Sequence, residues 1–138
     1  MTIDRFVFMS VLSLVIFHDN ASAAEVCPAK FTDFVARFST DLPFQKKHTA
    51  QELTVSHVID DDPEPRTVVR KVKNSKLKFP LMESTQAQRR KGLITSFQRS
   101  KGGDQIVLVH KPDTDWQIRF TFRKDACWLL IRRDDESL

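Results

Sequence analysis

The residues of this sequence that could act as nucleophiles or proton-transfer groups are few and lie far apart. After residue 23 they are the cysteines Cys27 and Cys127 and the histidines His48, His57 and His110. Nucleophilic catalysis needs a thiol or hydroxyl held beside a base, and no serine stands in a Gly-x-Ser-x-Gly turn. No His-x-x-x-His pair is present to hold zinc from one helix face. We therefore predict no enzyme activity, no metal site and no cofactor.

Carboxylate groups offer no better candidate. Acid–base catalysis by two carboxyl groups requires one of them to be buried, so that it keeps its proton near neutral pH. Asp33 and Asp41 fall on a predicted helix, and Asp113 and Asp115 flank a predicted turn, so neither pair has a specific reason to be buried. The acidic run 60–64 lacks the spacing of a calcium loop and is predicted to be a solvated hairpin loop.

Basic side chains favour an anionic partner, because the chain carries a net charge of +4. Arg119 and Arg123 fall on the wet face of a predicted strand, and Arg70 and Lys73 belong to another. If Arg119, Arg123 and a neighbouring cluster share a sheet face, they form a positive patch, our candidate binding face. Single-stranded nucleic acid would require aromatic side chains among the basic ones, but here the aromatics alternate away from the arginines. An unknown protein or envelope component is thus the expected partner, not nucleic acid. An ordinary solvated surface is the simplest alternative.

The N-terminal segment indicates export. Residues 1–5 are partly charged, residues 6–17 are apolar, and Ala21-Ser22-Ala23 follows. This is the pattern of a cleaved secretory signal, and the apolar run is shorter than the roughly 20 residues that cross a bilayer. We expect a signal peptide over 1–23, cleavage before Ala24, and a periplasmic or secreted single domain over 24–138 that does not span the membrane. A membrane anchor is the alternative.

An exported chain meets an oxidising compartment, in which cysteines tend to form disulfides. Cys27 and Cys127 are the two cysteines of the chain, and neither belongs to a Cys-x-x-Cys motif. A bridge between them would close a loop of about 100 residues, for which the chain-entropy model gives about 4 to 5 kcal/mol of stabilisation. We predict this disulfide as a structural one.

The elements that would position these residues follow from the spacing of apolar side chains. An amphipathic helix is predicted over 28–42, because apolar residues recur on one helical face at Phe31, Phe34, Val35, Phe38 and Leu42. This stripe is expected to dock the helix on a sheet. A further helical turn after Pro43 is compatible with the pattern.

Strands are predicted from apolar alternation and from short turn-like connections over 52–59, 67–73, 93–100, 105–111, 115–124 and 127–133. The segment 77–81 is predicted to be an edge strand or a strand end, and 83–91 is compatible with a helix. Alternation from Trp116 to Arg123 predicts one buried and one wet face. The strand 127–133 is apolar on both faces and should lie centrally or under the helix.

Three groups of apolar positions carry a family resemblance. They are Phe31-x-x-Phe34-x-x-x-Phe38-x-x-Asp41-x-x-Phe44-Gln45, then Phe79-Pro80-Leu81, then Phe120-x-Phe122 with Cys127-Trp128-Leu129-Leu130. In these positions the chain resembles the uncharacterised bacterial family DUF4348. The resemblance implies an NTF2-like cone, an α+β fold with an N-terminal helix packed on a curved antiparallel sheet. It implies no established activity and no catalytic residues.

Two classes of function remain at this stage. The first is a periplasmic or secreted binding or interaction module, of which an immunity or inhibitor-type protein is one form. The alternative is a small-molecule-binding or enzymatic cone, with His57, His110 or an aspartate in its pocket. His110 shares a strand side with Ile106 and Leu108, which suggests that it points into the core.

Overall fold

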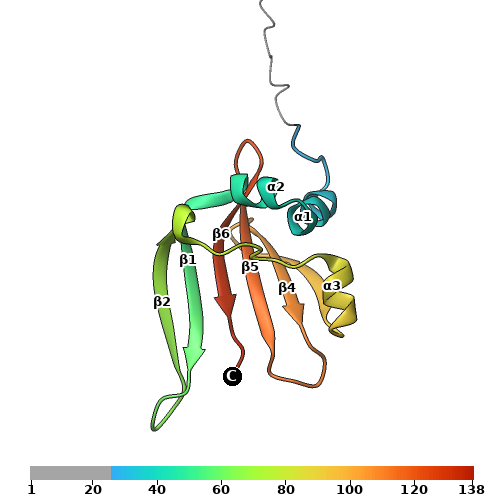
Figure 1. Ribbon diagram of the computed structural model, residues 1–138. Helices are drawn as coiled ribbons and strands as arrows, with labels where there is room; N and C mark the ends of the chain where they lie inside the picture. Colours follow the sequence, from blue (N-terminus) through green and yellow to red (C-terminus); the bar gives the residue numbers. More distant parts are fainter. Residues whose placement is uncertain (1–25) are drawn as a thin grey trace, which may run out of the picture.

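Helices cover one face of a six-stranded sheet in the computed structural model, which describes residues 26–138 (Figure 1). The predicted signal segment lies outside the described residues. The elements are α1 (Phe31–Thr40), α2 (Leu42–Lys47), β1 (Thr49–Ile59), β2 (Arg66–Lys73), the 3-10 turn η1 (Asn74–Lys76), α3 (Thr85–Arg90), β3 (Ile94–Arg99), β4 (Gln105–His110), β5 (Gln117–Lys124) and β6 (Trp128–Asp135).

The strand order is β2-β1-β6-β5-β4-β3, which confirms the predicted α+β fold with a curved sheet. Neighbouring strands among the described residues pair antiparallel, except that β1 and β6 are parallel. A parallel pair needs a long connection, and the chain from β2 to β5 supplies it here. The strand 127–133, predicted to be central, corresponds to β6 and lies between β1 and β5.

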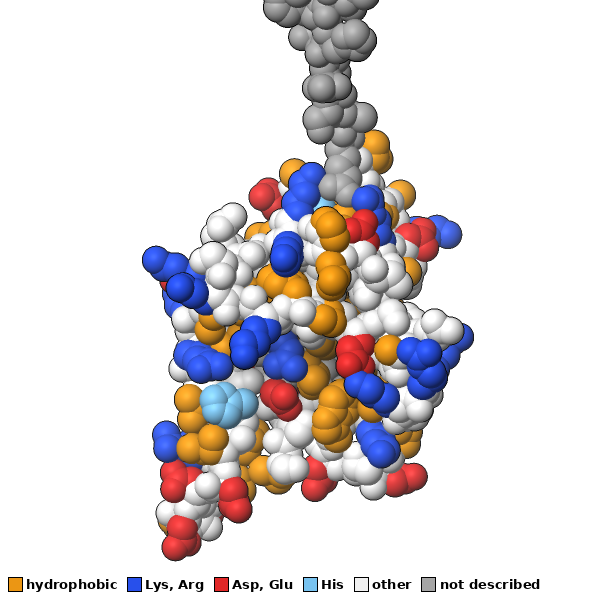
Figure 2. Space-filling model, in the orientation of Figure 1, with side chains coloured by type: hydrophobic (Ala, Val, Ile, Leu, Met, Phe, Trp, Pro, Cys, Tyr) orange, Lys and Arg blue, Asp and Glu red, His pale blue; other side chains and the backbone are white. Residues whose placement is uncertain are grey.

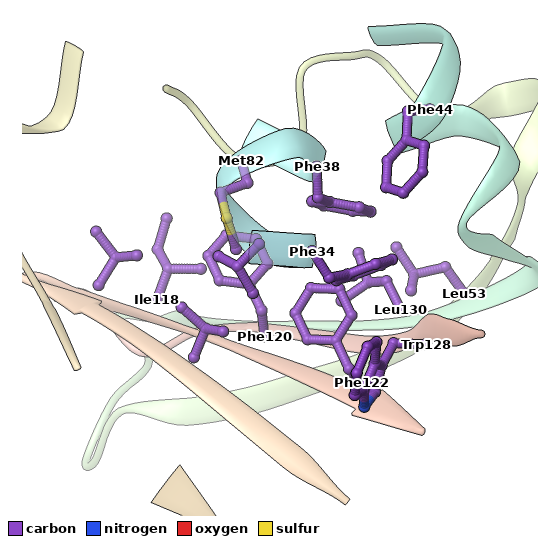
Figure 3. Packing of buried hydrophobic residues seen from close by; sticks show 13 residues of the cluster. Phe34, Phe38, Phe44, Leu53, Met82, Ile118, Phe120, Phe122, Trp128 and Leu130 are labelled. Atoms are coloured by element: carbon purple, nitrogen blue, oxygen red, sulfur yellow. The ribbon is translucent and has the colours of Figure 1, made fainter. Parts of the chain in front are cut away.

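The core lies between the helices and the sheet, and the phenylalanine stripe of α1 forms its centre (Figure 3). Phe34 and Phe38 are fully buried, and both rings pack edge-on against Phe122 of β5, at centroid distances of 5.7 and 5.2 Å. The predicted docking of this helix on a sheet is therefore confirmed. Leu42, predicted to share the stripe, is instead 45% exposed, because α1 ends at Thr40 and the chain changes direction.

The change of direction is caused by Asp41, whose backbone is extended between α1 and α2. Its side chain caps α2 by accepting a hydrogen bond from the backbone N–H of Phe44 at 3.0 Å. This hydrogen bond, helped by the nearby Arg37 guanidinium, lowers the pKa of Asp41 below its ordinary value. Pro43 fits the first turn of α2, because backbone N–H groups in a first turn have no hydrogen-bond partner within the helix and the absence of one costs little.

The lowered pKa of Asp41 predicts an acid-sensitive contribution to stability. Stability from a carboxylate with a depressed folded-state pKa is present above the ordinary carboxyl pKa of about 4 and is lost as the pH falls through the folded-state value. Asn caps helices as well as Asp does but has no proton to take up. We therefore expect Asp41→Asn to reduce the loss of stability that occurs as the pH falls below the ordinary carboxyl pKa of about 4, measured by urea titrations at a series of pH values. Identical pH dependence in both proteins would contradict this assignment.

The predicted disulfide is confirmed: Cys27 and Cys127 are bonded, with their Cα atoms 5.5 Å apart and 100 positions apart in the sequence. Cys27 lies before α1 and Cys127 lies directly before β6. The bridge therefore ties the residues that lead into the first helix to the connection that leads into a central strand.

The segment 77–84 crosses in front of β6 and β5 on its way from η1 to α3 (Figure 1). The prediction of an edge strand or strand end over 77–81 is wrong, because the buried side chain of Gln45 takes backbone groups that a strand would use. Its Oε1 accepts from the N–H of Leu81 at 2.5 Å, and its Nε2 donates to the carbonyls of Met82 at 3.0 Å and Phe38 at 2.7 Å. Gln45 thus joins α1, α2 and the crossing segment.

Candidate binding cleft

The four basic residues of the predicted binding face do not share one sheet face. Arg119 and Arg123 alternate with the buried residues of β5 and lie on the face that no helix within residues 26–138 covers, here called the open face. Lys73 also lies on the open face, whereas Arg70 points to the helix-covered face. Since β1 and β6 separate β2 from β5, Lys73 is remote from the two arginines.

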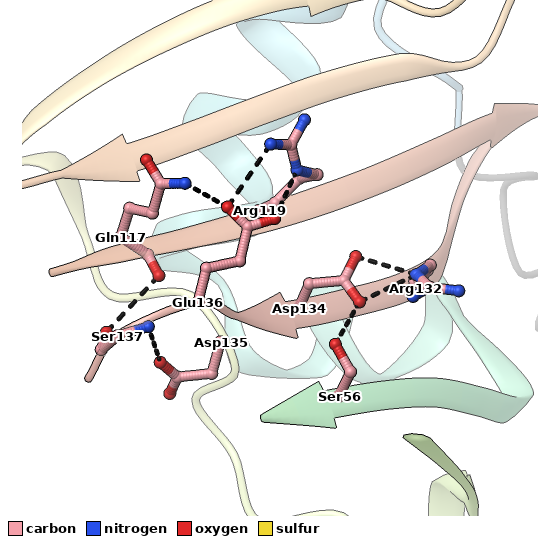
Figure 4. A network of polar contacts seen from close by, with 8 residues as sticks. All are labelled: Ser56, Gln117, Arg119, Arg132, Asp134, Asp135, Glu136 and Ser137. Atoms are coloured by element: carbon pink, nitrogen blue, oxygen red, sulfur yellow. Dashed lines mark hydrogen bonds and ion pairs between the residues drawn. The ribbon is translucent and has the colours of Figure 1, made fainter. Parts of the chain in front are cut away.

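Figure 4 shows two arginines of the open face, Arg119 and Arg132, each with a carboxylate partner. Arg119 donates to Glu136 from Nε at 3.0 Å and from Nη2 at 3.4 Å, and these hydrogen bonds raise the pKa of Arg119. Arg123 pairs more loosely with Asp104, at 3.4 Å. The two arginines of β5 proposed for recognition, Arg119 and Arg123, are therefore both paired with carboxylates of the same chain.

A second polar cluster crosses the open face between β1 and β6. Asp134 is 6% exposed, and its carboxylate accepts hydrogen bonds from the Ser56 hydroxyl and from Nε of Arg132, the latter at 2.8 Å. The hydrogen bond between Arg132 and Asp134 raises the pKa of Arg132. This cluster joins the parallel strands β1 and β6 and offers no unmatched charge.

The helix-covered face contains two hollows beneath the crossing segment. The inner hollow has a volume of about 190 Å³ and is lined mainly by apolar side chains, which include Met82, Leu93, Val109, Trp116, Ile118 and Phe120. The outer hollow, of about 580 Å³, has a polar lining that includes His57, Arg70, Lys76, Lys78 and Asp135. Both hollows are lined by Pro80, Leu81 and Arg133, so we describe them together as one cleft.

The outer hollow is strongly positive. The side chains of Arg70, Lys76 and Lys78 make no hydrogen bond or ion pair within residues 26–138. Arg133 has one carboxylate nearby, with its Nη2 3.7 Å from Oδ2 of Asp135. Figure 2 shows Lys and Arg side chains gathered beside a histidine over β1 and its neighbouring strands. The outer hollow is therefore lined in part by cationic side chains that no carboxylate of the described residues neutralises.

The two histidines proposed for a pocket lie on different faces. His57 of β1 lines the outer hollow beside Asp135, its partner in the strand register, but no hydrogen bond joins the two side chains. His110 does share a strand side with Ile106 and Leu108, but that side is the open face, because Val107 and Val109 form the core. The suggestion that His110 points into the core is therefore wrong. Its Nδ1 is nevertheless buried and has no hydrogen-bond partner among the described residues.

Arg133 was not identified as a site residue from the sequence, because β6 contains a bulge. Leu130 pairs with Phe122 and Arg132 pairs with Thr121, so Ile131 is an extra residue. After the bulge, Arg133 and Asp135 face the helices in place of Arg132 and Asp134. Simple alternation from Trp128 assigns the opposite faces, and only the pairing with β5 reveals the correct one.

The fold is similar to that of a known protein of the same architecture. The chain resembles the crystal structure of an NTF2-like protein from Bacteroides fragilis, with a TM-score of 0.55 and 18% sequence identity over 83% of this chain. The match covers 50% of that protein, so this chain spans about half of its length. No protein-family model and no curated protein matches the sequence. Among the described residues, no helix has the length and apolar character to cross a membrane. The chain has an NTF2-like α+β fold, with a cleft between its sheet and its crossing segment.

Proposed function

We propose that this protein is an exported, non-catalytic binding module that holds a small ligand in the cleft beneath the crossing segment, residues 77–84. The observation that carries the proposal is the shared lining of the two hollows, in which Arg133 borders both an apolar and a positively charged space. Ligand sites of proteins combine an apolar lining with a few polar groups that fix orientation. The export component is supported by the Cys27–Cys127 disulfide, which suits an oxidising compartment.

We place recognition in the cleft, which includes Arg70 of the predicted basic residues, rather than on the open face. The guanidinium groups of Arg119 and Arg132 on the open face donate to carboxylates of the same chain, at 3.0 and 2.8 Å. A partner that recognised these arginines would have to displace those carboxylates. An immunity or inhibitor-type protein, which would bind its partner through an exposed face, is therefore less well supported than a ligand-binding cleft.

The enzymatic alternative would use His57 and Asp135, which line the outer hollow together. A histidine acting as a general base is normally oriented by a hydrogen bond to a third group. No hydrogen bond of the His57 side chain connects it to Asp135 or to another described residue. The pair therefore lacks the positioning that would favour catalysis over binding, and we retain the non-catalytic proposal.

Backbone amide NMR shifts test the location of binding. A library with equal numbers of anionic, neutral and cationic small molecules is titrated into the isotope-labelled chain. We expect binding compounds to shift the amides of Leu81, Val109 and Arg133 in the cleft. The amides of Gly102 and Gly103, in the loop between β3 and β4 at the end of β4 remote from Val109, are expected to change little. Shifts confined to residues that do not line the cleft, or no binding by any compound, would contradict the proposal.

A further inference from the structure

We infer that the cleft binds an organic anion with a short apolar body, the charged group meeting Arg133 and Arg70 and the body entering the inner hollow. This inference rests on the proposed binding function and adds the chemical class of the ligand. It follows from the division of the cleft into a positive part and an apolar part.

The outer hollow selects for negative charge. Four cationic side chains, Arg70, Lys76, Lys78 and Arg133, line it against the single carboxylate of Asp135. A partly enclosed space lined by one sign of charge concentrates ions of the opposite sign. Carboxylate and phosphate groups suit such a site, since guanidinium groups bind them through paired N–H donors.

Arg133 is the residue best placed to hold the charged group. Its Nη2 is 3.7 Å from Oδ2 of Asp135, well beyond the roughly 2.7 to 2.9 Å of a charge-assisted hydrogen bond. Asp135 therefore leaves most of the five guanidinium N–H donors available. The guanidinium carbon also lies 5.9 Å from the ring centroid of Phe120, which lines the inner hollow. Arg133 thus stands where the positive and apolar parts meet.

The inner hollow selects for an apolar body and limits its size. Its aromatic lining includes Trp116 and Phe120, and the charged residues at its edge, Glu83 and Lys91, pair with each other at 2.5 Å. The volume of about 190 Å³ is below the roughly 300 to 1,000 Å³ of drug-sized ligand pockets. A short aliphatic chain or a single ring fits this space better than a long lipid chain.

The test compares probes that differ in one property. Octanoate and phenylacetate carry both the charge and the apolar body, octan-1-ol lacks the charge, octylammonium reverses it, and acetate and inorganic phosphate lack the body. Binding is measured by calorimetry and by the change in tryptophan fluorescence, to which Trp116 in the inner hollow and Trp128 in the core both contribute. We expect octanoate or phenylacetate to bind at least about tenfold more tightly than octan-1-ol, acetate or phosphate, and octylammonium to bind weakest.

Matched arginine variants connect the binding to the site. We expect Arg133→Gln to weaken binding of the preferred carboxylate by about tenfold to a hundredfold, since it removes a charged hydrogen-bond donor. Arg123→Gln, the same change at a 64% exposed side chain on the open face, should alter binding less than about twofold. Arg70→Gln, on the exposed strand β2, gives an independent test if Arg133→Gln fails to fold.

Each contrary outcome has a distinct meaning. Equal affinity for octanoate and octan-1-ol, with no effect of Arg133→Gln or Arg70→Gln, would overturn the anion inference and leave cleft binding intact. If acetate or phosphate binds as tightly as octanoate, the inference that the ligand needs an apolar body is wrong. If only neutral or cationic library members shift the cleft amides, the ligand class is wrong. If no compound shifts them, the proposed function itself fails.

Discussion

Replacing Cys27 and Cys127 together by alanine is expected to lower the free energy of unfolding by about 4 kcal/mol. The bridge joins residues 100 positions apart, so it removes a large amount of conformational freedom from the unfolded chain. The chain-entropy model gives about 4 to 5 kcal/mol for such a loop, and residual structure in the unfolded state reduces this value. Since a domain of this size is stable by only about 5 to 15 kcal/mol, the double variant should be close to the limit of folding.

Urea unfolding of the oxidised chain and of the double variant measures this effect. The variant should unfold at a lower urea concentration and should be insensitive to a reducing agent, whereas reduction should shift the unmodified chain toward the variant. A double variant within about 1 kcal/mol of the oxidised chain would show that the loop-closure argument does not apply here.

Replacing Gln45 by leucine is expected to lower the free energy of unfolding by about 3 kcal/mol. Leucine has a similar size but no polar atoms, so the N–H of Leu81 and the carbonyls of Met82 and Phe38 lose their Gln45 partner. Each buried polar group left without a hydrogen bond costs about 1 to 3 kcal/mol. Gln45 is fully buried and Met82 is 1% exposed, so water cannot readily replace the lost hydrogen bonds.

The same substitution at Gln51, an exposed residue of β1, is the matched control, and we expect its effect to stay within about 0.5 kcal/mol. Hydrogen exchange should become faster at the amides of Leu81 and Met82 in the Gln45 variant and remain unchanged in the control. An effect of Gln45→Leu no larger than that of Gln51→Leu would mean that Gln45 does not hold the crossing segment.

Gln45 also connects the stability of the fold to the proposed function. Leu81 lines both hollows of the cleft, and its backbone is held by the amide of Gln45. Loosening this contact should therefore weaken carboxylate binding even though Gln45 does not line the cleft. Binding sites are held more accurately when the residues behind them are fixed by packing and hydrogen bonds.

Much of the fold was predictable from local patterns. The apolar stripe at Phe31, Phe34 and Phe38 predicted a helix that packs on a sheet, since these positions recur on one helical face. Strict alternation in β5 predicted which face of the strand is buried. Both predictions depend on residues within a few positions of each other. In both elements, the burial of apolar surface decides which side faces the core.

The candidate site could not be predicted in the same way. The predicted basic face combined Arg70 and Lys73 with Arg119 and Arg123, although residues three positions apart on one strand point to opposite faces, so alternation alone excludes a shared face. Only the pairing of β2 with β1 decided that Arg70 is the one that faces the helices. Ion pairs with Glu136 and Asp104 also involve residues far along the chain, so they were invisible at the level of local pattern.

The sequence by itself determined most of the helices and strands and the cysteine pair, because helical spacing, strand alternation and the presence of just two cysteines are local or compositional properties. Only the tertiary structure decided the parallel pairing of β1 with β6, the bulge at Ile131 that turns Arg133 toward the helices, and the course of residues 77–84 held by Gln45. In each of these features, backbone N–H and C=O groups find their hydrogen-bond partners in segments that are distant in the sequence. Those partners are brought together only when the whole chain folds. The cleft is formed by two of them, the bulge and the crossing segment.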